Sequence, residues 1–121
     1  MKKSKSILHS FGYALQGLVS AFRTERNMKV HVFMMIIVIL LGSLLKITCF
    51  EWMVCILLFG GVIGAELINT AIEITVDLAM PEKHKKAKLA KDIAAAGVLV
   101  FAMVAAIIGG IIFIPKLVAL L

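Results

Sequence analysis

The sequence predicts an all-α integral membrane protein, in which three transmembrane helices follow an N-terminal amphipathic helix at the membrane surface. Of its 121 residues, 62% are hydrophobic, whereas a soluble domain is about half apolar. Long apolar runs recur along the chain and approach the length that crosses a ~30 Å hydrocarbon core at 1.5 Å per residue. A chain this short is expected to form one domain over residues 1–121.

The first expected element is a surface helix over about residues 6–28. Its apolar residues recur at steps of three and four, which is one face of a helix: Ile7, Leu8, Phe11, Leu15, Leu18, Val19 and Phe22. Lysines and arginines flank this face, as in helices that lie in a membrane interface. A signal peptide is disfavoured, because Gln16 and glycines interrupt the run and no A-x-A cleavage site follows.

Three membrane helices are expected, over about residues 30–49, 52–79 and 88–115. The first is built on the apolar run Val32 to Leu45, and the third on Ile93 to Ile114, which Pro115 is expected to end. The second has an apolar part, Trp52 to Ala65, that is too short to span alone. It therefore has to take polar residues into the membrane.

Basic residues indicate the orientation and a membrane partner rather than a nucleic acid. There are 13 Lys and Arg against 7 Asp and Glu. The N-terminal segment and the second loop hold most of them: Lys2, Lys3, Lys5, Arg23, Arg26 and Lys29, then Lys83, Lys85, Lys86, Lys88 and Lys91. The positive-inside rule puts these two segments in the cytoplasm and the C-terminus outside.

Small residues at steps of four favour close approach of helices in lipid. They are Gly60 and Gly64 on the second span, and Ala102, Ala106 and Gly110 on the third. Because three thin helices enclose a site poorly, an oligomer is expected. The alternative is that these positions pack within one protomer.

The second span leaves its apolar run with a stripe of polar side chains: Glu66, Asn69, Thr70, Glu73 and Asp77. At 3.6 residues per turn they fall within roughly 60° of one direction. A charge at the centre of a membrane helix costs about 2.5–3.5 kcal/mol, so such a residue usually faces a protein interior and has a function. A solvated helix end explains Asp77, but it does not explain Glu66.

The stripe suggests chemistry on an alcohol at the membrane surface. Glu66 is placed to act as a base, and Glu73, nearer the cytosol, is placed to hold magnesium, which takes one or two carboxylates plus substrate phosphates. Glu25 stands at the same interface, and lysines of the second loop are available for phosphates, although such lysines are more often a topology signal. No glycine-rich phosphate loop occurs in the chain.

These residues resemble the small bacterial diacylglycerol kinase and undecaprenol kinase family. The resemblance rests on AELINTAIEITVDL followed by AKD (residues 90–92), and it extends over GYALQGL, RTERN and the three spans. RTERN, EWM and ELINTAIE favour the Gram-positive undecaprenol kinase branch. The resemblance implies a homotrimer in the bacterial plasma membrane, with active sites shared between protomers, and ATP with Mg²⁺ as the phosphate source.

Residue roles follow from the same resemblance. It implies Glu66 as the catalytic base, Asn69 and Asn27 as supports, and Glu25 and Glu73 as metal ligands that also contact ATP. The remaining implied nucleotide contacts are Tyr13, Glu82, His84, Lys91 and Asp92. Ser6 stands where some diacylglycerol kinases of this family have an arginine, which favours a different lipid preference.

Three alternatives remain open. The first is diacylglycerol kinase activity, because apolar grooves discriminate poorly between lipids. The second is a holin-like pore, although the third span lacks the repeated polar residues that a pore would need. The third is a proton-relay subunit that uses Glu66. His9 and His31 are expected at the interface, without a zinc partner.

Overall fold

A computed structural model describes residues 6–121, and this part of the chain contains four helices and no strand. They are α1 (Ile7–Thr24), α2 (Arg26–Leu45), α3 (Cys49–Ala79) and α4 (Lys85–Ala119). The predictions made for Lys2, Lys3 and Lys5 lie outside the described residues. The all-helical class predicted from the sequence is confirmed over residues 6–121.

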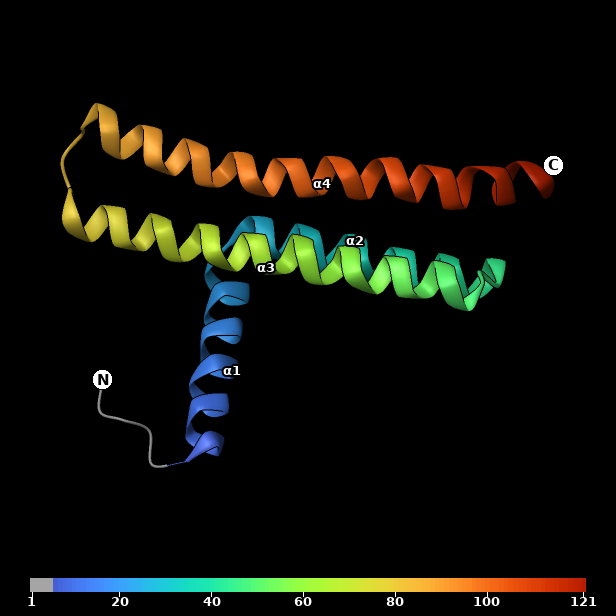
Figure 1. Ribbon diagram of the computed structural model, residues 1–121, viewed down its shortest axis with the longest axis horizontal. Helices are drawn as coiled ribbons and strands as arrows, with labels where there is room; N and C mark the ends of the chain where they lie inside the picture. Colours follow the sequence, from blue (N-terminus) through green and yellow to red (C-terminus); the bar gives the residue numbers. More distant parts are fainter. Residues whose placement is uncertain (1–5) are drawn as a thin grey trace.

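The three long helices run alongside one another, and α1 runs across them (Figure 1). The longest packing interface lies between α3 and α4, which are antiparallel, while α2 lies beside α3. The helix α1 meets the bundle partway along α3, so both α3 and α4 extend beyond it toward their connecting loop (Figure 1). This extension places one end of the α3–α4 pair past the level of α1.

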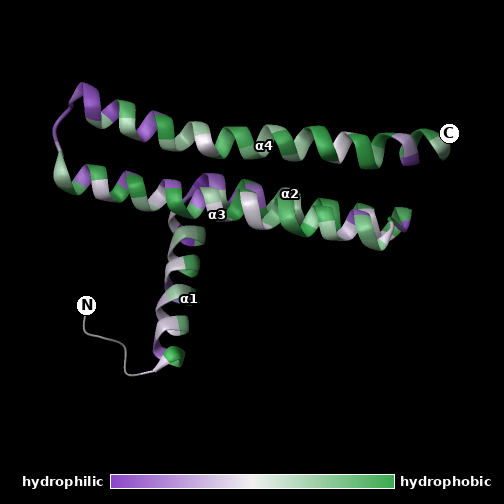
Figure 2. Cartoon of the chain, in the orientation of Figure 1, coloured by the Kyte–Doolittle hydropathy of each residue, from purple (hydrophilic) through white to green (hydrophobic). Residues whose placement is uncertain are grey.

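Each of α2, α3 and α4 is long and apolar enough to cross a membrane. Hydrophilic positions gather near the α3–α4 loop and near the junction of α1 with α2, while the other half of the bundle is mainly hydrophobic (Figure 2). Most large apolar side chains on these helices are exposed, among them Phe33, Leu57 and Ile107. Such exposure suits a lipid solvent rather than water.

Local sequence signals set where the helices begin. Thr48 and Glu51 form a reciprocal capping box at the start of α3, in which Thr48 Oγ1 accepts from Glu51 N at 3.1 Å and Glu51 Oε1 accepts from Thr48 N at 2.9 Å. At the start of α4, His84 Nδ1 accepts from Lys86 N at 3.1 Å. Ser6 caps α1 by accepting from His9 N at 3.4 Å. These bonds satisfy amide groups that lack partners within the helix.

Three predicted helix ends are wrong. The first membrane helix runs over Arg26–Leu45 rather than about 30–49, and Lys46 follows it in a left-handed backbone conformation. The surface helix ends at Thr24 rather than near residue 28, because Glu25 is extended and lets the chain turn from α1 into α2. The last helix continues past Pro115 to Ala119. Proline removes one helical hydrogen bond, a loss that membrane helices tolerate, and Lys116 also fixes this end by pairing with Glu51 of α3 at 3.2 Å.

Glycines allow close approach at positions other than those predicted for a helix contact. A Cβ added at Gly61 of α3 would overlap the ring of Phe101 on α4, and one at Gly42 would lie 2.9 Å from the Trp52 ring. At Gly60 and Gly64 nothing lies within 4 Å of an added Cβ. Packing within one protomer therefore depends on Gly61, while Gly60 and Gly64 face open space.

Candidate functional site

The polar stripe of α3 becomes more buried with distance from the α3–α4 loop. Glu66 is 1% exposed, Asn69 5% and Thr70 7%, whereas Glu73 is half-buried and Asp77 is exposed. Thr70 Oγ1 donates to the backbone oxygen of Glu66 at 3.0 Å, so this hydroxyl is occupied within the helix. Neither carboxylate oxygen of Glu66 has a hydrogen-bond partner among residues 6–121. Buried polar groups usually have partners, and exceptions are often functional.

The junction between α1 and α2 lies against this part of α3. Ala21 and Met28, on either side of the junction, are among the most buried apolar residues, and α1 contacts α3 as well as α2. Between them, Glu25 is half-buried, and Glu25 and Glu73 both lie within electrostatic range of Glu66. The fold thus brings together three predicted acidic residues that are up to 48 positions apart in the chain, counted from Glu25 to Glu73.

A second cluster lies where α3 approaches the start of α4. Lys91 Nζ is 2.7 Å from Asp77 Oδ1, and Glu73 and Asp92 are also within electrostatic range of the lysine. On the neighbouring turn, Lys88 Nζ lies 2.6 Å from Asp92 Oδ2. Glu73 is therefore within electrostatic range of both Lys91 and Glu66.

The other predicted site residues are exposed at the surface of the protomer. Tyr13 is exposed on α1, and α1 makes no contact with α4 within the described part of the chain. Glu82 and His84 lie in the exposed α3–α4 loop. Asn27 is exposed on the first turn of α2. Within the described part of one protomer, Tyr13 therefore lies on a helix that does not contact α4, which carries Lys91 and Asp92.

The acidic residues are not arranged as a complete metal cage. Within residues 6–121, no group of three or more His, Cys, Asp or Glu side chains could hold a metal ion. Glu25 and Glu73 nevertheless supply the hard oxygen donors that magnesium prefers, and magnesium needs only one or two carboxylates when phosphates and waters complete its shell. The residues present fit a metal ion that arrives with a nucleotide.

His31 is a neighbour of Glu66 that sequence reasoning missed. Its Nε2 lies 3.9 Å from Glu66 Oε2, across the contact between α2 and α3. The spacing of residues along either helix gives no sign of this approach, because it depends on how the two helices are aligned. The one sequence feature that pointed to such a contact was His31 itself, a histidine about one turn inside a helix expected to span the membrane.

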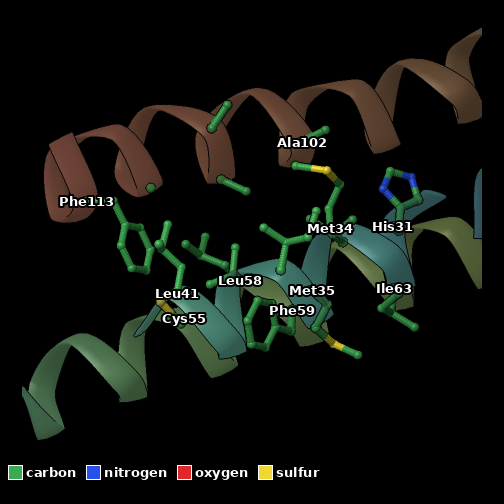
Figure 3. A pocket seen from close by; sticks show the side chains of 16 residues that line it. His31, Met34, Met35, Leu41, Cys55, Leu58, Phe59, Ile63, Ala102 and Phe113 are labelled. Atoms are coloured by element: carbon green, nitrogen blue, oxygen red, sulfur yellow. The ribbon is translucent and has the colours of Figure 1, made fainter. Parts of the chain in front are cut away.

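A cavity of about 400 Å³ lies between α2, α3 and α4. His31 stands at one end, and Cys55 and Phe113 stand at the other (Figure 3). The remaining lining is apolar, with methionines of α2 and alanines of α4 among it. The cavity is thus an apolar space that reaches the neighbourhood of Glu66 at its histidine end.

Comparisons with known proteins agree on one family. The family profile described as prokaryotic diacylglycerol kinase matches residues 12–113. The undecaprenol kinase of Bacillus subtilis strain 168 is 47% identical over 108 residues, which cover 89% of this chain and 88% of that protein. The diacylglycerol kinase of Synechocystis sp. PCC 6803 is 41% identical over 117 residues, covering 96% of this chain and 67% of its own. That of Pseudomonas aeruginosa PAO1 is 36% identical over 92 residues, covering 76% and 75%.

Proposed function

The chain belongs to the prokaryotic diacylglycerol kinase family and is a membrane lipid kinase, and we propose that the lipid it phosphorylates is undecaprenol. Support for this substrate is the 47% identity to an undecaprenol kinase, against 41% and 36% to two diacylglycerol kinases. The family argues against the pore and the proton-relay alternatives.

One observation supports the catalytic assignment above the others. Glu66 is a fully buried carboxylate without a hydrogen-bond partner in the described chain, and two further carboxylates, Glu25 and Glu73, lie within its electrostatic range. A base requires a free acceptor oxygen within reach of the proton it removes. Glu66 provides this oxygen at the level where α1 meets the bundle, which is the depth at which a lipid hydroxyl and a cytoplasmic nucleotide can meet.

In the proposed reaction, Glu66 accepts the proton of the lipid hydroxyl as that oxygen forms a bond to the γ-phosphorus of ATP. The bond from the γ-phosphorus to the β–γ bridging oxygen breaks, and ADP leaves with the electron pair. Phosphoryl transfer depends mainly on positioning and charge stabilisation. Bound magnesium would supply charge neutralisation on the phosphates, held by Glu25 and Glu73.

The remaining residues position the two substrates. Lys91 would contact the phosphates, with Asp92 and Asp77 fixing its orientation, since Asp77 already pairs with it at 2.7 Å. Asn69, which is 5% exposed beside Glu66, and Asn27 on α2 would support the site. Tyr13, Glu82 and His84 would contact the rest of the nucleotide.

The proposed assembly is a homotrimer with active sites shared between protomers. This arrangement would let Tyr13 of one protomer join residues of another, since α1 does not contact α4 in the described part of a single chain. It would also cover Gly60 and Gly64, which face open space. In the bacterial plasma membrane, α1 would lie at the cytoplasmic surface with its exposed Phe11 and Leu15 in the lipid. The α3–α4 loop would be cytoplasmic and the C-terminus outside.

The test is phosphate transfer from labelled ATP by purified protein in mixed micelles, with undecaprenol and diacylglycerol compared at equal mole fraction. We expect a higher kcat/KM for undecaprenol, and loss of transfer to both lipids in Glu66→Gln. A higher kcat/KM for diacylglycerol would refute the proposed substrate while leaving the kinase chemistry intact. Parental activity in Glu66→Gln would refute the proposed base.

A further inference from the structure

Among the described residues, no hydrogen bond fixes the orientation of the Glu66 carboxylate, the proposed base. Glu66 is 1% exposed, and both of its carboxylate oxygens lack hydrogen-bond partners among residues 6–121. An unpaired polar group in an apolar interior is costly, and more so when it is charged. A carboxylate that can rotate freely also presents its acceptor oxygen poorly, although a general base has to lie within hydrogen-bond reach of its proton.

His31 is the side chain best placed to hold this carboxylate. Its Nε2 lies 3.9 Å from Glu66 Oε2, and its side chain is 18% exposed. This separation exceeds a hydrogen bond by about 1 Å. Catalytic hydrogen bonds are often long in ligand-free structures and shorten when substrate binds, so a small rotation of either side chain would complete the contact.

The other groups around Glu66 are less suited to donate to it. Glu25 and Glu73 are the charged groups within its electrostatic range, and an ionised carboxylate only accepts hydrogen bonds. The Thr70 hydroxyl already donates to the backbone oxygen of Glu66. Asn69 carries an amide donor, but it lies three residues farther along the same helix, and neither Glu66 carboxylate oxygen accepts a hydrogen bond from it.

The surroundings of His31 on its other side contain no competing partner. The ring stands at the end of the apolar cavity between α2, α3 and α4 (Figure 3). Apart from the Cys55 thiol, which is at the far end, the other side chains that line this cavity carry no hydrogen-bonding nitrogen or oxygen. This lining therefore offers no hydrogen-bond partner close to the ring, whereas Glu66 Oε2 lies 3.9 Å from its Nε2.

We infer that His31 is a positioning residue for the base: its Nε2–H donates to Oε2 of Glu66 and leaves Oε1 to accept the proton of the lipid hydroxyl. This inference rests on the proposed role of Glu66. It assigns to His31 the tautomer that carries a proton on Nε2. The histidine would act through the carboxylate and would not exchange a proton with the substrate itself.

The test compares His31→Leu with His31→Gln, because the glutamine amide retains an N–H donor while it cannot titrate. We expect His31→Leu to lower kcat about 10- to 100-fold, the loss of one hydrogen bond to a charged group. The KM for ATP should stay near the parental value, and His31→Gln should recover most of the lost kcat. His9→Leu is the matched control, because His9 is an exposed histidine on α1, and its kcat should be parental.

Unfolding in sodium dodecyl sulfate, measured in the same micelles, shows whether each variant is folded. The inference fails if folded His31→Leu keeps the parental kcat, or if folded His31→Gln is as slow as His31→Leu. If His31→Leu does not fold, His31→Gln and His31→Asn decide the question, since slow turnover in both folded amide variants also contradicts a donor role. Glu66→Gln is assayed in parallel, so that failure of the proposed base is distinguished from failure of its positioning residue.

Discussion

Replacing Glu66 with glutamine is expected to change activity and stability in opposite directions. The substitution keeps the size of the side chain and removes both its charge and its basicity. In this structure the carboxylate is 1% exposed and unpartnered within the described chain. When a residue is selected for chemistry rather than for stability, its substitution is expected to lower activity and to raise stability.

The magnitudes follow from this burial. Loss of a general base lowers the rate by about 10²–10⁴, which corresponds to roughly 3–5 kcal/mol of activation free energy. An unsatisfied buried amide costs about 1–3 kcal/mol and a charged group more, so the free energy of unfolding should rise by about 1–2 kcal/mol. The assays are initial rates with undecaprenol in mixed micelles and unfolding in sodium dodecyl sulfate.

Glu51→Ala is the matched control, because Glu51 is a carboxylate of the same helix with two partners. It caps α3 through Thr48 and pairs with Lys116 at 3.2 Å, at the end of α3 opposite to the site. We expect this variant to lose stability and to keep the parental kcat. The reasoning is refuted if Glu66→Gln retains activity, or if it loses stability together with activity as a purely structural residue would.

Two further predictions concern packing and phosphate binding. Gly61→Ala should lower the free energy of unfolding by about 1–3 kcal/mol, because the added Cβ would overlap the Phe101 ring. Gly12→Ala is the control and should not lower it, because nothing lies within 4 Å of the added carbon. Equal unfolding curves of the two variants in detergent would contradict this prediction. Lys91→Ala should lower kcat/KM for ATP about 10²–10³-fold, as loss of a group that stabilises transition-state charge does. Lys88→Ala should stay near the parental kcat/KM, since Lys88 is an exposed residue that pairs with Asp92. Equal losses in the two variants, measured by steady-state kinetics, would argue against a specific role for Lys91.

Much of the fold was predictable from local features of the sequence. Apolar runs and their breaks are local, and they indicated all four helices, including one continuous helix that carries both the apolar run and the polar stripe. The period of 3.6 residues also predicted that Glu66, Asn69 and Thr70 share one face, and burial of all three agrees with this. The predicted ends at residues 28, 49 and 115 were wrong: the chain turns at Glu25 and at Lys46, and the last helix continues through Pro115 to Ala119.

The sequence by itself determined which residues are helical, which faces are polar, and which carboxylate is too costly to leave in lipid without a purpose. Only the tertiary structure decided which side chains meet: His31 with Glu66, Glu51 with Lys116, and Gly61 rather than Gly60 with α4. The physical reason is that helix periodicity is fixed by backbone hydrogen bonds between residues four apart. Contacts between helices depend instead on their relative alignment and crossing, which packing of the whole chain sets.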